Sequence, residues 1–60
     1  MYGYVTKFSI DATDNCCNNP SKFKKGELQQ AINDAKAHYQ NGNASKDWYN
    51  YVVRRLSAYL

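Results

Sequence analysis

The chain has 60 residues, a mass of 6.9 kDa and a formal net charge of +3. A chain of this length forms one small domain, which we place over residues 1–60 and which buries only about 60% of the surface that the unfolded chain exposes. This size argues against a two-domain enzyme and against any fold that builds a deep substrate cavity from its own residues.

Residues 2–10 are predicted to form an N-terminal β-strand. Aromatic and β-branched side chains occupy every second position, which is the spacing of one face of a strand: Tyr2, Tyr4, Thr6, Phe8 and Ile10. A single strand cannot satisfy its own backbone hydrogen bonds. We therefore expect this strand to pair with another chain, in a homodimer or at the sheet edge of a partner, or with a short second strand within residues 11–17.

Residues 11–21 are predicted to be a loop, with a short turn of helix as the alternative, because Asp, Asn and Pro dominate the segment and these residues favour turns. The segment contains two adjacent cysteines, Cys16 and Cys17. A disulfide framework in a small secreted protein needs separated cysteine pairs. We therefore expect two reduced thiols in a cytoplasmic protein.

Two helices are predicted for the rest of the chain, over about residues 22–41 and 46–59. Apolar side chains recur at helical spacing in both segments: Leu28, Ala31, Ile32, Ala35 and Tyr39 in the first, and Trp48, Val52, Leu56 and Tyr59 in the second. Gly42 suits the left-handed conformation that ends many helices. The connection is short, so we expect an antiparallel helical hairpin. The predicted fold class is therefore α+β, with the order β-α-α.

The sequence offers little that points to catalysis or to a metal. Its one histidine, His38, is expected beside the apolar stripe of the first helix, and nothing places it near Cys17 or supplies a third group to orient such a pair. Structural zinc requires four ligands, and adjacent cysteines seldom bind one ion together. We expect a protein that is not an enzyme, with no catalytic residue, no metal and no cofactor.

Basic and aromatic side chains are the candidates for binding a partner. The aromatic content of 15% is too high for a core this small to bury. Exposed Tyr beside Arg or Lys is the composition of binding hot spots. We expect the partner-binding residues to be Tyr2, Tyr4, Lys24, Lys25, Tyr51, Arg54 and Arg55.

The order of one strand and two helices in a small basic chain resembles that of ribbon-helix-helix proteins. In that family two strands pair across a dimer and enter the major groove of DNA. The resemblance implies a dimeric DNA-binding regulator that would use Lys7 and Ser9 on the strand and Ser45 near a phosphate. This chain departs from the family by placing residues 11–21 between strand and helix, where the family has only a few residues.

Small Tyr- and Asn-rich chains without catalytic residues also resemble the inhibitors that viruses and mobile elements encode, anti-CRISPR proteins among them. The favoured hypothesis is a binding protein that inhibits or modulates a larger host complex by steric occlusion. Its partner would be an acidic or nucleic-acid-binding surface of that complex, since a positive net charge favours acidic partners. No signal peptide or membrane-spanning stretch is apparent, so we expect a cytoplasmic location.

Overall fold

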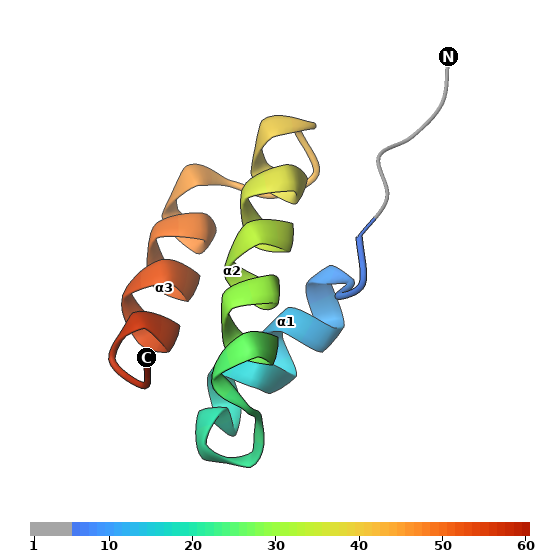
Figure 1. The fold of residues 1–60 in the computed structure, drawn as a ribbon. Helices are drawn as coiled ribbons and strands as arrows, with labels where there is room; N and C mark the ends of the chain where they lie inside the picture. Colours follow the sequence, from blue (N-terminus) through green and yellow to red (C-terminus); the bar gives the residue numbers. More distant parts are fainter. Residues whose placement is uncertain (1–5) are drawn as a thin grey trace.

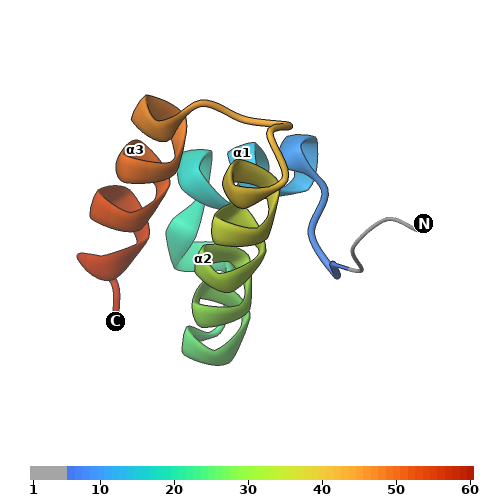
Figure 2. The same ribbon diagram turned by 90° about the horizontal axis from the view of Figure 1, so that it is seen from above.

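The structure, a computed structural model, describes residues 6–60, which form three α-helices and a short 3-10 helix (Figure 1). The elements are α1 (Ile10–Asn18), η1 (Pro20–Lys22), α2 (Lys25–Gln40) and α3 (Lys46–Ser57). The last two helices lie side by side and antiparallel, and α1 packs against both of them (Figures 1 and 2). The order of elements is therefore helix, helix, helix within the described part of the chain.

The predicted α+β fold is wrong, because no strand or sheet occurs among residues 6–60. Residues 2–5 of the predicted strand lie outside the described residues. At its other end, the Ser9 hydroxyl accepts a hydrogen bond from the Ala12 amide at 3.1 Å and so caps a helix that begins at Ile10. The alternation of side chains that predicted a strand therefore runs into the start of a helix. The tertiary structure overrides the preference of these side chains for a strand.

The predicted loop over residues 11–21 is also wrong, because α1 occupies most of it. Asp, Asn, Thr and Cys are poor helix formers in isolation. The helix is stabilised instead by burial of Thr13, Cys16 and Cys17, which lie three and four residues apart and face the other two helices. Only the end of the segment is irregular, with η1 starting at Pro20.

The two predicted helices are present with small changes in their ends. α2 begins at Lys25 rather than near residue 22, and the Glu27 carboxylate accepts a hydrogen bond from the Lys24 amide at 2.9 Å. The helix ends at Gln40, close to the predicted end, and Gly42, which follows the Asn41 cap, has a left-handed φ of 79°. The Gly42 amide donates to the Tyr39 carbonyl and the Asn43 amide to the His38 carbonyl, which together form a Schellman motif.

The core lies where the three helices meet. Its fully buried apolar side chains are Cys16, Cys17, Leu28, Ala31, Ala35, Val52 and Leu56. Partly buried hydrophobic side chains pack around this cluster: Phe8, Phe23, Ile32, Trp48 and Tyr49. Tyr59 was expected in the core stripe of the last helix, but it follows the end of α3 and remains 41% exposed.

None of the helices within residues 6–60 has the length and apolar character needed to cross a lipid bilayer.

Candidate functional site

An open hollow on α3 contains three of the residues that the sequence predicts to bind a partner. It is lined by Tyr51, Arg54, Arg55 and Ala58 and has a volume of about 340 Å³. These positions are three, four and seven residues apart, so one face of the helix carries all four side chains. The hollow therefore combines an aromatic ring, a methyl group and two guanidinium groups on a single rigid element.

Arg55 is held in place by the neighbouring helix. Its Nε donates a hydrogen bond to the carbonyl oxygen of Cys17 at 2.9 Å. That carbonyl belongs to the last turn of α1, where carbonyl groups have no partner within their own helix and carry partial negative charge. The Arg55 guanidinium also lies 5.7 Å from the centre of the Tyr59 ring. The conformation of Arg55 is therefore set before any partner binds.

The exposed apolar surface is concentrated around the same hollow. Tyr51 is 45% exposed and Tyr59 is 41% exposed, which makes them, with Leu60, the large hydrophobic residues most open to solvent among residues 6–60. We call Tyr51, Arg54, Arg55, Ala58 and Tyr59 the α3 face. Large amphipathic rings beside arginines have the composition of energetic hot spots in protein interfaces.

Two further predicted residues, Lys24 and Lys25, are exposed at the start of α2. Lys24 lines a second hollow of about 390 Å³ together with Lys7, Phe8, Gly26, Glu27 and Gln30. The structure thus separates the predicted binding residues into the α3 face and a lysine cluster at the start of α2. Tyr2 and Tyr4 lie outside the described residues.

The residues expected to contact DNA have other partners. Both serines cap helices: the Ser9 hydroxyl accepts from the Ala12 amide, and the Ser45 hydroxyl accepts from the Trp48 amide at 3.1 Å. The Lys7 side chain is exposed, while its amide donates to the Asp34 carboxylate at 3.0 Å. Because residues 6–9 form no strand, the arrangement by which the ribbon-helix-helix family reads DNA is not available to them.

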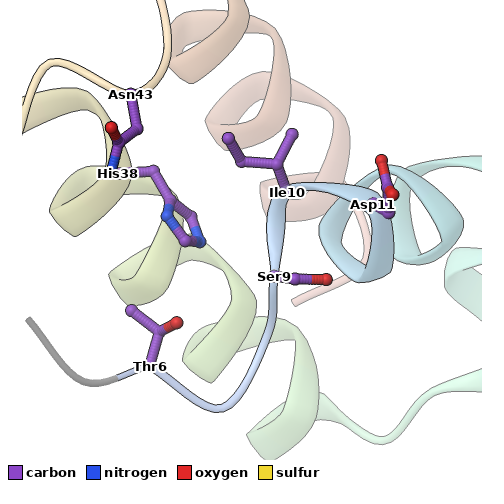
Figure 3. Close-up of a pocket in the computed structure, with 6 residues that line it drawn as sticks. All are labelled: Thr6, Ser9, Ile10, Asp11, His38 and Asn43. Carbon is purple, nitrogen blue, oxygen red and sulfur yellow. The ribbon is translucent and has the colours of Figure 1, made fainter.

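A shallow hollow of about 600 Å³ lies between the N-terminal segment and the end of α2 (Figure 3). Its lining residues are Thr6, Ser9, Ile10, Asp11, His38 and Asn43. The Ser9 hydroxyl points away from the imidazole of His38. The His38 Nε2 lies 2.8 Å from the Phe8 carbonyl oxygen, which can only accept, so this nitrogen carries the proton. Ser9 and His38 therefore do not form a nucleophile and base pair.

The two thiols are buried and unreactive in character. Burial raises the pKa of both cysteines, and that of Cys17 reaches about 11, with a further contribution from the nearby Asp14 carboxylate. A thiol that stays protonated at neutral pH is a poor nucleophile and a poor metal ligand. Within residues 6–60, no group of three or more His, Cys, Asp or Glu side chains is placed to hold a metal ion.

The sequence analysis gave no role to Asp34, which the structure places at a central polar junction. It is only 4% exposed and accepts three hydrogen bonds: from the amides of Lys7 and Phe8 to Oδ2, and from the Gln30 side chain to Oδ1. A helical wheel puts Asp34 away from the apolar stripe, and only the path of the N-terminal segment over that side of α2 buries it. No sequence signal indicates that path.

Comparisons of this chain with models of known protein families, with curated proteins and with solved structures returned no match.

Proposed function

We propose that this chain is a small non-enzymatic protein that binds a larger macromolecular complex and inhibits or modulates it by covering one of its surfaces. The observation that carries the proposal is the α3 face, where exposed tyrosines surround an arginine that the fold already holds in position. The partner surface would be protein, because tyrosine rings and a methyl group offer apolar contact area as well as charge.

Side chains of the α3 face are already ordered in the unbound chain, which favours binding. Association costs about 0.5–1.5 kcal/mol for each flexible side chain that becomes immobilised. Arg55 already lies against the Cys17 carbonyl and the Tyr59 ring, so little of this cost remains for it. Three residues of the face, Tyr51, Arg54 and Arg55, also lie on a regular helix of 12 residues rather than on a loop. A partner would therefore meet a surface that is largely preorganised.

Site-specific cross-linking tests the proposal. A photo-crosslinking phenylalanine analogue would replace Tyr51 in one variant and Gln40 in a control, since Gln40 is exposed at the far end of α2. After irradiation in a lysate of the source cells, the protein attached at position 51 would be identified and purified. Its affinity would then be measured for the original chain, for Tyr51→Ala and Arg54→Ala, and for the control Lys36→Ala.

We expect one protein species to be attached at position 51 and not at position 40. Tyr51→Ala and Arg54→Ala should each weaken binding to the purified partner at least ten-fold, which corresponds to about 1.4 kcal/mol, while Lys36→Ala should change it less than two-fold. The bound chain should also lower the activity of the partner in proportion to occupancy. Equal attachment at both positions, or affinity unchanged by both α3 substitutions, would refute the proposal.

A further inference from the structure

The basic side chains of the chain gather at one end of the fold. Five of the eight Lys and Arg residues lie in η1, at the start of α2 or in the last turn of α3: Lys22, Lys24, Lys25, Arg54 and Arg55. All five are exposed. Because α2 and α3 are antiparallel, the start of one helix and the end of the other meet at the same end of the molecule (Figure 1). We call these five residues the basic end.

Each half of the basic end is placed by contacts with the rest of the fold. The hydrogen bond from Arg55 to the Cys17 carbonyl fixes the last turn of α3 against the end of α1, which η1 follows directly. On the other side, Lys24 shares its hollow with Lys7, which extends the positive surface along α2. The cations therefore form two groups at one end of the fold, one around the start of α2 and one on the α3 face.

Acidic side chains offset this charge only in part. Glu27 is the one acidic residue in the first turn of α2, and its carboxylate accepts the Lys24 amide. Asp11 and Asp47 lie in the first turns of α1 and α3. Those turns adjoin the far end of α2, where Asp11 shares a hollow with His38 and Asn43 (Figure 3). Two of the five acidic residues, Asp11 and Asp47, therefore lie away from the basic end, so the fold separates charge in part along its length.

We propose that the partner presents an acidic amphipathic protein segment, and that its carboxylates contact the basic end while its apolar side chains pack on the α3 face. This inference rests on the proposed function and names the chemistry of the partner. Charge complementarity of this kind steers two proteins toward one orientation and speeds their encounter. The end of the molecule that carries Lys25 and Arg54 would therefore approach the partner first.

Two observations favour a protein segment over nucleic acid. The α3 face places Tyr51, Ala58 and Tyr59 beside the cations, and the phosphates that basic side chains contact on a duplex offer little apolar area to cover them. The Glu27 carboxylate also lies within the Lys7 and Lys24 hollow, where it would repel a continuous row of phosphates. Discrete carboxylates on a protein can be spaced to avoid it.

Fluorescence anisotropy with three labelled probes tests the inference at low and physiological salt. The first probe is a synthetic helical peptide of Glu, Leu and Ala with about 20 residues, which spans about 30 Å when helical. The second is an oligoglutamate of equal length, and the third is a duplex DNA of similar length. The variants are the double charge reversal K22E/K25E and its matched control K36E/K46E, which changes the net charge equally away from the basic end.

The expected order of affinity is the amphipathic peptide first, then oligoglutamate, then DNA. K22E/K25E should weaken peptide binding at least ten-fold, and K36E/K46E less than three-fold. Folding should survive, because acidic residues are favourable in the first turn of a helix, where residue 25 lies. Binding should also weaken as salt rises, because added ions screen exposed charges.

The outcomes separate this inference from the proposed function. If the two double variants lose equal affinity for the amphipathic peptide, the basic end is not the binding site. The α3 face would then still be tested by the cross-linking experiment. Tighter binding of DNA than of either peptide would overturn it in favour of nucleic acid. If Tyr51→Ala weakens binding of the amphipathic peptide but not of oligoglutamate, the result supports separate roles for the two surfaces: apolar contact at the α3 face and charge contact at the basic end. If Tyr51→Ala leaves both peptides unchanged, the α3 face fails.

Discussion

Replacement of Asp34 by Ala should remove a large share of the stability of this fold. The carboxylate is buried and is the acceptor for the amides of Lys7 at 3.0 Å and Phe8 at 2.8 Å, as well as for the Gln30 side chain at 2.9 Å. Hydrogen bonds to a charged group contribute about 1.5–3 kcal/mol each, and a buried amide left without an acceptor costs about 1–3 kcal/mol. These terms overlap, so we expect Asp34→Ala to cost about 3 kcal/mol.

This loss is large in proportion to the whole. A 60-residue domain has a total stability of only about 3–9 kcal/mol. Asp34→Asn should cost less, about 1 kcal/mol, because its amide oxygen still accepts the two backbone amides while the charge is lost. The Gln30 amide would then turn to offer its oxygen to the new donor. The expected order of stability is therefore the original chain, then Asp34→Asn, then Asp34→Ala.

Urea unfolding followed by circular dichroism measures these free energies, and amide hydrogen exchange reports Lys7 and Phe8 directly. The matched control is Asn33→Ala, an exposed neighbour whose side chain accepts only from Gln29 at 3.3 Å. It should change stability by about 0.5 kcal/mol or less. The reasoning fails if Asp34→Ala costs no more than the control, or if the two amides keep their protection from exchange in Asp34→Ala.

Three further substitutions test the helix ends and the core. Gly26→Ala should raise the free energy of unfolding by about 0.4–1 kcal/mol, because a Cβ there meets no atom within 4 Å and the unfolded chain loses freedom; a lower urea midpoint would contradict this. Gly42→Ala should lower it by about 1 kcal/mol, because a φ of 79° is unfavourable for Ala; an unchanged midpoint would argue against the Schellman motif. The pKa of the Cys17 thiol is about 11 in the folded chain, so between pH 9 and 11 the thiol ionises more readily in the unfolded chain. The free energy of unfolding should therefore fall by up to about 3 kcal/mol as the pH rises through this range. Urea unfolding of Cys17→Ala across this range should show a shallower fall, and an identical pH profile would refute the assignment.

The helical hairpin could be predicted from the sequence because its signals are local. The stripe that contains Leu28 and Ala35, the left-handed Gly42 and the cap at Ser45 all act within one or two turns of helix. Tyr51, which was expected to bind a partner, is 45% exposed. These features depend on residues three or four positions apart, which periodicity detects.

The N-terminal part could not be predicted because its determinants are distant in sequence. The amides of Lys7 and Phe8 find their acceptor in Asp34, 26 and 27 residues away. α1 contains residues that favour turns and forms because Cys16 and Cys17 reach a core supplied by the other helices. No sequence pattern between residues 2 and 20 indicates the contact with Asp34 or the burial of the two cysteines. The Ser9 cap with Asp11 in the first turn was the one local sign of a helix start.

The corrected fold changes where a partner can bind. A lone strand would have presented unpaired backbone groups, and a partner would have been recognised through main-chain hydrogen bonds. In the structure, Asp34 accepts the amides of Lys7 and Phe8, and His38 binds the Phe8 carbonyl, so these groups are already satisfied within the chain. Under the proposed function, these groups are not free to pair with a partner's strand, and the α3 face offers side chains instead. Exposed apolar rings and two arginines lie together at the C-terminal end of α3, so under the proposed function the α3 face is the surface at which a partner would bind.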